Sequence, residues 1–207
     1  MTPMASVTGA AAPILKTNVN TDIIIPGSYL RSQSADLAQG LFAAWRFDDS
    51  GNEKPDFVLN QAPFRQAKIV LAGNNFGCGS SREAAVWALQ RFGIRVVLAP
   101  SFADIFYENA FRNGVLPGIV AADAIAEMAE IAATNPEFTV DLDRKLVLHG
   151  NRSWAFDVPE SRRAALMRGD DEIGMTLAMA NEIADFHARD VAGRDWAYAP
   201  MGRAPRG

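Results

Sequence analysis

The sequence predicts an α/β domain built on a mixed β-sheet, and three stretches of the chain support this class. Residues 68–72 form a short apolar run that ends at a glycine and is followed by a helical pattern. Residues 95–133 continue as strand, helix, strand and helix, which implies parallel pairing with crossover connections. Residues 138–157 hold three short strands joined by tight polar turns, as in an antiparallel meander. Parallel and antiparallel strands combined with helices fit a layered β/β/α domain.

Composition indicates a soluble protein without a general affinity for polyanions. The chain has 207 residues, of which 49% are apolar, and 24 acidic against 20 basic side chains give a net charge of −4. This balance argues against a nucleic-acid surface, so an anionic substrate must meet a local cluster of positive charge. No apolar run approaches the roughly 20 residues of a membrane span. We therefore expect a cytoplasmic protein with neither nucleic acid nor membrane as partner.

Metal-binding residue types are scarce. The single cysteine, Cys78, excludes an internal disulfide and cannot supply the several thiolates of an iron–sulfur cluster. The two histidines, His149 and His187, have no second ligand at a useful spacing. We expect no metal on this chain, and any cluster beside it must belong to another chain.

The predicted domain spans residues 14–191. Residues 1–13 are rich in Ala, Thr and Pro without a period and are predicted to be a mobile tail. Residues 192–207 are polar and rich in Pro and Gly, which predicts a second tail. A helix over residues 175–189 is expected to close the fold.

The residues between 18 and 59, before the strand predicted at residues 68–72, are expected to form short and irregular elements. Residues 18–26 are expected to form a loop that enters a short strand, with Asn20 able to bond its own backbone in an Asx-type turn. The apolar spacing of residues 36–47 predicts one helix. Residues 57–59 and 68–72 are expected to flank a connection that contains Pro63.

The glycine-rich turn after residues 68–72 is the strongest functional signal. Gly77 and Gly79 flank Cys78, so the backbone there can adopt positive φ and approach a ligand closely. Ser80 or Ser81 is expected to cap the helix that ends at Gly93, with Arg82 in its first turn. Hydroxyls, unpaired backbone N–H groups and a cation then meet at one helix N-terminus, which predicts an anion site.

Other phosphate and nucleophile motifs fit this stretch poorly. In a dinucleotide fingerprint, Arg82 would occupy the place of the third glycine. A P-loop would need a Gly-Lys-Ser/Thr ending, and a nucleophile elbow would need Gly-x-Ser-x-Gly. A plain capped helix after a tight turn would explain the glycines and one serine, but it leaves the adjacent Ser-Ser-Arg without a role.

Three segments carry a resemblance to a known family. They are Gly-Cys-Gly-Ser-Ser-Arg-Glu from Gly77, Asn-Thr-Asp-Ile-Ile-Ile-Pro from Asn20, and Ala-Pro-Ser-Phe-Ala-Asp-Ile-Phe from Ala99. Together they resemble the small subunits of 3-isopropylmalate dehydratase, which are separate-chain counterparts of the swivelling domain of aconitase. The resemblance runs in matching order from about Lys16 to Asp190.

The resemblance implies a swivelling three-layer β/β/α domain like the C-terminal domain of aconitase. It also implies a hydro-lyase that is active only as a complex with a large subunit. That complex would interconvert 2- and 3-isopropylmalate by dehydration and rehydration in leucine biosynthesis. Its [4Fe-4S] cluster would be bound by the large subunit, and its substrate is a small dicarboxylate.

Catalytic roles carried over from the family fall on the Ser-Ser-Arg triplet. The resemblance makes Ser80 the base, and because a serine hydroxyl is a very weak acid, its alkoxide needs backbone N–H groups and a cation beside it. Arg82 suits that role and can also bind a substrate carboxylate with two parallel hydrogen bonds. Ser81 is expected to donate to the same carboxylate or to hold the turn. Gly77, Cys78 and Gly79 shape the loop.

Substrate-binding roles are expected in the segment before residue 35. The resemblance places Thr21 and Asp22 close to the active site. Residues 27–34 lie where the family varies with substrate, so Tyr29, Leu30 and Arg31 are candidates for the wall that meets the substrate's side group.

Two positions depart from the family pattern. Ala84 follows Glu83 where the family usually has histidine, and Val86 replaces a common proline. These changes leave two alternatives open. The same machinery could act on citraconate/methylmalate, 2,3-dimethylmalate or homoaconitate, or the chain could be a non-catalytic binding domain that kept the swivel-type fold.

Overall fold

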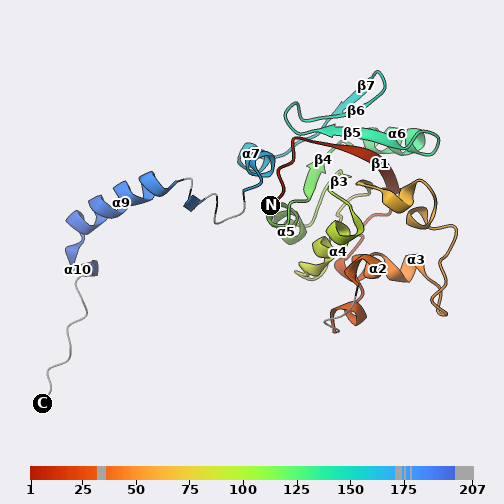
Figure 1. The fold of residues 1–207 in the computed structure, drawn as a ribbon, viewed down its shortest axis with the longest axis horizontal. Coiled ribbons are helices and arrows are strands. Elements are labelled where there is room, and N and C mark those ends of the chain that lie inside the picture. The colour runs from red at the N-terminus through yellow and green to blue at the C-terminus, as the bar shows by residue number, and fades with distance from the viewer. Residues whose placement is uncertain (32–35, 171–173, 175, 178, 199–207) are drawn as a thin grey trace, which may run out of the picture. The chain divides into compact units, whose positions relative to one another are not determined.

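The structure is a computed structural model that describes residues 1–31, 36–170, 174, 176–177 and 179–198 (Figure 1). It divides into two compact units, residues 1–169 and residues 170–207. The first unit carries the sheet and every predicted site residue. Within the described residues no helix is long and apolar enough to cross a membrane.

The first unit is organised around a seven-stranded mixed sheet with the order β4-β3-β2-β1-β5-β6-β7. Neighbours among β1 to β4 pair in parallel, and β1, β5, β6 and β7 pair in antiparallel fashion. The strands are β1 (Ser6–Ile14), β2 (Ile69–Ala72), β3 (Val96–Ala99), β4 (Leu116–Ile119), β5 (Glu137–Asp141), β6 (Leu146–His149) and β7 (Arg152–Ala155). The predicted fold class, an α/β domain with a mixed sheet, is therefore confirmed. Pro117 is tolerated because β4 lies at the edge of the sheet. In an edge strand, backbone N–H groups that point away from the sheet have no partner strand, so a proline can replace one of them.

Strand β1 corrects the prediction of a mobile tail over residues 1–13. It lies in the middle of the sheet, pairing with β2 on one side and β5 on the other (Figure 1). Val7, Ala11 and Ala12 are buried in it. The small side chains that made this stretch look unstructured allow it to be covered on both faces, and pairing with distant strands supplies the backbone hydrogen bonds.

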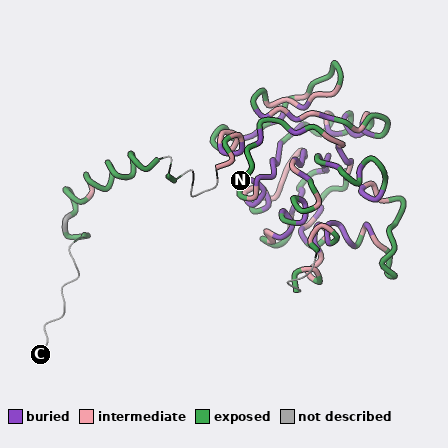
Figure 2. The backbone as a smooth tube through the Cα atoms, in the orientation of Figure 1, coloured by how far each residue is buried: buried purple, intermediate pink, exposed green. Residues whose placement is uncertain are grey.

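The parallel strands place alternate side chains on opposite faces of the sheet. Val70 and Val97 belong to one hydrophobic cluster, and Leu71 and Leu98 belong to another. The first cluster is covered by α1 (Thr21–Ile24), α2 (Leu37–Gly40), α3 (Ala43–Arg46), α4 (Ala84–Phe92) and α5 (Asp104–Arg112) together with the 3₁₀ turns Gly27–Leu30, Val58–Asn60 and Phe64–Gln66. Figure 2 shows these strands as the buried centre of the unit.

The second cluster joins both halves of the sheet. It contains Leu71 and Leu98 from the parallel strands and Phe138, Val140 and Val147 from the antiparallel strands. It is completed by α6 (Ala122–Ala132) and α7 (Glu160–Arg168). The antiparallel meander predicted for residues 138–157 is thus confirmed and helps to enclose the core.

Two predictions for the segment before β2 are wrong. The helix expected over residues 36–47 is broken at Phe42, whose φ of 50° is left-handed. The break has a tertiary cause, because the buried Phe42 donates its N–H to the carbonyl of Ile24 at 2.8 Å and stacks on Trp45. The expected strand after residue 20 is the short helix α1, and residues 57–59 enter a 3₁₀ turn. Asn20 does make the expected side-chain bond, accepting from the N–H of Ile23 at 2.8 Å.

The second unit contains α9 (Ala180–Gly193) and α10 (Asp195–Tyr198). None of the described residues of α9 is buried, and Ile183, Phe186 and Val191 are exposed. The helix expected to close the fold is therefore part of a separate unit, and α9 and α10 extend into the predicted second tail. Residues 199–207 lie outside the described chain.

Candidate functional site

The candidate site lies where the chain leaves the carboxyl ends of β1 and β2. The segment after β1 runs alongside the glycine-rich loop after β2 and is tied to it by backbone hydrogen bonds. Gly77 donates its N–H to Val19 O at 2.8 Å, and Thr21 donates its N–H to Cys78 O at 2.9 Å. Two of the three segments that carry the resemblance, those from Asn20 and from Gly77, are thus brought together by main-chain pairing and not by side chains alone.

Thr21 holds Ser80 through two contacts of its hydroxyl. Thr21 Oγ1 lies 3.0 Å from Ser80 Oγ and donates to the Ser80 carbonyl at 3.2 Å. Thr21 is buried, with 1% of its surface exposed, whereas Ser80 is exposed. Ser80 is therefore accessible from solvent, and its hydroxyl has a polar partner in the buried Thr21.

Arg82 is oriented by the segment that carries Asp22. Arg82 Nη1 forms an ion pair with Asp22 Oδ1 and donates to the Ile25 carbonyl at 3.0 Å. The Arg82 side chain is 22% exposed, and the Asp22 side chain is 64% exposed. Across the described residues, the side-chain hydrogen bonds of Arg82 all involve Nη1. This arrangement leaves the rest of the guanidinium to meet a carboxylate from solvent.

The structure corrects the expected position of the serines at the helix N-terminus. The N-cap of α4 is Glu83, and its side chain makes no capping hydrogen bond. Arg82 donates its N–H to the Ser80 carbonyl at 2.7 Å, so the chain turns before the helix begins. Neither Ser80 nor Ser81 caps α4, and Arg82 precedes its first turn. The positive charge available to an anion here comes from the Arg82 side chain.

The loop glycines behave as the sequence predicts. Gly77 and Gly79 have φ of 79° and 96°, values that L side chains rarely adopt. A Cβ at Gly77 would lie 2.1 Å from the ring of Phe106, so side-chain volume is excluded as well. Cys78 is half-buried between them, and its backbone accepts the hydrogen bond from Thr21.

The remaining predicted substrate residues are not joined to this cluster. Tyr29 is half-buried and lines a cavity of about 510 Å³, while Leu30 and Arg31 are exposed. Among the described residues, no hydrogen bond or ion pair links any of the three to Ser80. The rest of the predicted wall, residues 32–34, lies outside the described chain.

Sequence reasoning missed Asn113, which supports the start of α4. Its Nδ2 donates to Glu83 Oε1 at 2.8 Å, and its Oδ1 accepts from Trp87 Nε1 at 3.0 Å. The available signal was weak, because a polar residue before Gly114 is equally typical of an ordinary helix end.

The donor set of this chain does not fit an iron–sulfur cluster. No group of three or more His, Cys, Asp or Glu side chains within the described part of the chain could hold a metal ion. The sequence contains one cysteine, whereas a [4Fe-4S] cluster is typically held by several thiolates.

Comparison with known proteins shows which family the chain belongs to. Residues 1–122 match the model of the aconitase C-terminal domain. Over 195 residues the chain is 48% identical to the 3-isopropylmalate dehydratase small subunit of Rhodospirillum centenum, covering 92% of this chain and 96% of that protein. The chain belongs to the 3-isopropylmalate dehydratase small-subunit family.

A second small subunit and a solved structure support the same family. The Brucella anthropi small subunit is 46% identical over 202 residues, covering 95% of this chain and all of that protein. A crystal structure of 3-isopropylmalate dehydratase from Methanocaldococcus jannaschii superposes with a TM-score of 0.61 at 27% identity. That match covers 87% of this chain and 98% of the other, so both the resemblance and the fold expected from it are confirmed.

Proposed function

We propose that this chain is the small subunit of a 3-isopropylmalate dehydratase, a hydro-lyase that works as a complex with a large subunit. The complex converts 2-isopropylmalate to 3-isopropylmalate by dehydration and rehydration in leucine biosynthesis. The observation that carries this proposal is the 48% identity to a small subunit of that name, which extends over nearly the whole of both chains. The Ser80 and Arg82 geometry is chemically consistent with it.

In this proposal Ser80 is the base that removes the proton from the carbon next to the hydroxyl-bearing carbon. Dehydration then leaves an alkene, and the reverse steps on the other carbon complete the isomerisation. A serine alkoxide is unstable without local support. Thr21 Oγ1, 3.0 Å from Ser80 Oγ, can turn its hydroxyl hydrogen toward the alkoxide, and the Arg82 cation adds electrostatic stabilisation.

Arg82 also binds one carboxylate of the diacid. Asp22 and the Ile25 carbonyl hold Nη1, so the guanidinium plane is oriented before substrate arrives. Pre-orientation lowers the entropy lost on binding. Asp22 is therefore a positioning residue for Arg82, and Ser81 is a second donor to the same carboxylate.

We assign the cluster to the large subunit. An aconitase-family enzyme implies an iron–sulfur cluster in the complex, and this chain has one cysteine with which to hold it. When bound, a [4Fe-4S] cluster supplies a Lewis-acidic iron that polarises the leaving hydroxyl. The task left to this chain is proton transfer and carboxylate binding.

The substrate's side group is proposed to meet Tyr29, Leu30 and Arg31. Leu30 is 40% exposed, so its side chain is accessible to a substrate bound in the complex. An isopropyl group needs an apolar wall at this place, whereas a third carboxylate would need a cation.

The test is an anaerobic assay of this chain mixed with its large subunit. Alkene formation is followed from 2- and 3-isopropylmalate and, side by side, from citramalate, with each subunit alone as control. Preferred turnover of isopropylmalate by the mixture alone is expected. Activity on citramalate only would overturn the substrate assignment, and no activity with an intact cluster would overturn the enzymatic role.

A further inference from the structure

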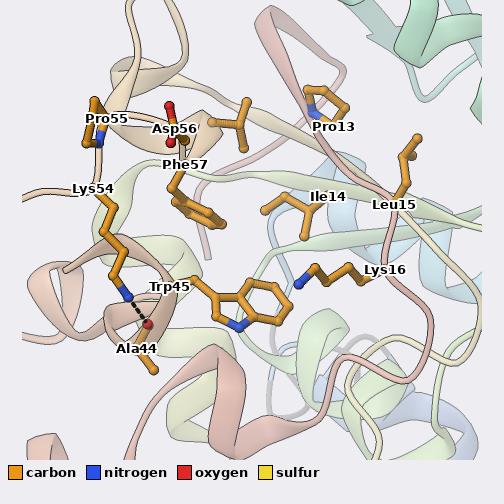
Figure 3. Close-up of a pocket in the computed structure, with 11 residues that line it drawn as sticks. Pro13, Ile14, Leu15, Lys16, Ala44, Trp45, Lys54, Pro55, Asp56 and Phe57 are labelled. Atoms are coloured by element: carbon orange, nitrogen blue, oxygen red, sulfur yellow. Dashed lines mark hydrogen bonds between the residues drawn. The ribbon is translucent and has the colours of Figure 1, made fainter. Parts of the chain in front are cut away.

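A cavity of about 570 Å³ lies apart from the Ser80 site, between the end of β1, helix α3 and the segment before the second 3₁₀ turn (Figure 3). It is lined by Pro13, Ile14, Leu15, Lys16, Ala44, Trp45, Lys54, Pro55, Asp56, Phe57 and Val58. None of these residues has a role in the proposed reaction. Its size falls within the range of ordinary small-molecule sites, roughly 300–1,000 Å³.

The body of the cavity is apolar and aromatic. Figure 3 shows the side chains of Ile14, Trp45 and Phe57 turned toward one another around the open space. The rings of Trp45 and Phe57 lie 6.0 Å apart at a tilt of 56°, so the wall is rigid aromatic packing. Such a surface favours a compact aliphatic group.

Two ammonium groups give this apolar cavity a positive edge. Lys16 Nζ lies 4.6 Å from the centroid of the Trp45 ring, and Lys54 Nζ donates to the Ala44 carbonyl at 3.0 Å. Neither lysine forms an ion pair with any described carboxylate. In the view of Figure 3 the Trp45 ring lies between the two ammonium nitrogens, and the Asp56 carboxylate lies on the Phe57 side.

We propose that this cavity is a second binding site, which takes a small monocarboxylate with a compact aliphatic body. The aliphatic part packs against Ile14, Trp45 and Phe57, and the carboxylate accepts a hydrogen bond from Lys16, while Lys54 adds a second positive charge at the edge of the cavity. Each lysine already has a contact that fixes its end near the cavity, which lowers the entropy lost when an anion binds. The inference is independent of the role of Ser80, because the two sites share no residue.

Isothermal titration of the complete chain with 4-methylpentanoate tests the proposal without any enzyme assay. Saturable binding is expected, with the neutral 4-methylpentan-1-ol binding at least about tenfold more weakly because it lacks the charge-assisted hydrogen bonds. Acetate, which lacks the aliphatic body, is expected to bind more weakly than 4-methylpentanoate. Absence of saturation by about 10 mM, or equal binding of acid and alcohol, would overturn the proposal.

Matched variants locate the binding. Lys16→Met and Lys54→Met keep the aliphatic stems and remove the charges; Lys16→Met is expected to weaken binding about tenfold and Lys54→Met to weaken it less. Lys68→Met is the control, since Lys68 is exposed and does not line the cavity. Tryptophan fluorescence should respond to 4-methylpentanoate in the parent chain and lose that response in Trp45→Phe. Undiminished binding in Lys16→Met would show that the carboxylate is held elsewhere and would overturn the proposal.

Discussion

Thr21 Oγ1 lies 3.0 Å from Ser80 Oγ, although the two residues are 59 positions apart in the chain. Parallel pairing of β1 with β2 produces this meeting, because the carboxyl ends of parallel strands reach the same edge of the sheet. The segments that follow are then joined by the bond from the Thr21 N–H to the Cys78 carbonyl. A hydroxyl from one segment can thereby support a base on the other.

Thr21→Val removes this hydroxyl and keeps the side-chain shape. We expect kcat of the assembled enzyme to fall about tenfold with a smaller change in KM, because one hydrogen bond to the alkoxide contributes roughly 1 kcal/mol or more. The measurement is steady-state kinetics under anaerobic conditions. Thr8→Val is the control, since Thr8 makes a similar bond to Thr139 at 2.8 Å on an exposed part of the sheet. Equal losses in both variants would refute a specific role for Thr21.

Asp22→Ala tests whether Asp22 positions Arg82. Because the Asp22 carboxylate is largely exposed, the variant should lose less than about 1 kcal/mol in the free energy of unfolding. We expect KM for the diacid to rise about tenfold as Arg82 loses its fixed orientation. Glu53→Ala breaks a comparable surface pair with Arg65 and should leave KM unchanged. An unchanged KM in Asp22→Ala would contradict the positioning role.

Gly77→Ala and Gly51→Ala separate backbone strain from steric exclusion. Both glycines have positive φ, but a Cβ at Gly51 meets nothing within 4 Å, whereas one at Gly77 lies 2.1 Å from Phe106. Gly51→Ala should destabilise by about 1–2 kcal/mol. Gly77→Ala should cost a further 1–3 kcal/mol, roughly, for overpacking against the ring. Urea denaturation measures the free energy of unfolding of both variants. Similar losses in the two would show that the loop at Gly77 shifts to accommodate the added methyl group and would contradict steric exclusion by Phe106.

Alkaline pH should destabilise the fold through Tyr107. Burial raises the pKa of the Tyr107 phenol above its usual 10.0, and the nearby carboxylates of Asp157 and Glu108 raise this pKa further. A folded-state pKa above the unfolded value gives stability that is complete below pH 10 and is lost as the pH rises through the folded pKa. Tyr107→Phe should therefore show a shallower alkaline decline in the free energy of unfolding, measured by denaturant titration at several pH values. Identical declines would exclude this residue as the cause.

Local signals in the sequence were enough to predict the parallel strands β2, β3 and β4. The apolar run of residues 68–72 became β2 at Ile69–Ala72, because such a run is buried on both faces in any α/β sheet. The predicted end of α4 was also right. Gly93 adopts the left-handed conformation that ends a helix, with φ of 111°.

Features that depend on distant partners could not be predicted. Strand β1 lacks a clear alternating pattern, and its place in the sheet depends on β2 and β5, which lie far along the chain. The break at Phe42 follows from a hydrogen bond to Ile24, a contact that no local pattern records. Tertiary contacts override local propensity at both places.

Within the candidate site, the sequence was enough to name the residues, but it did not reveal how their side chains are arranged. The serines looked like caps because Ser is favoured at an N-cap, yet the bond of Ser80 with Thr21 and the turn at Arg82 delay the start of α4 until Ala84. The ion pair of Asp22 with Arg82 also depends on the pairing of the two loops, which the sequence spacing does not reveal.

The most direct test of the account is the turnover of the assembled enzyme with Ser80→Ala in this chain, compared with Ser81→Ala as the neighbouring control. Anaerobic kinetics are combined with co-purification of the large subunit. We expect Ser80→Ala to lose several orders of magnitude in kcat while the subunits still associate, because the proton acceptor itself is gone. Ser81→Ala should lose far less. Retained turnover in Ser80→Ala would contradict the assignment of Ser80 as the base.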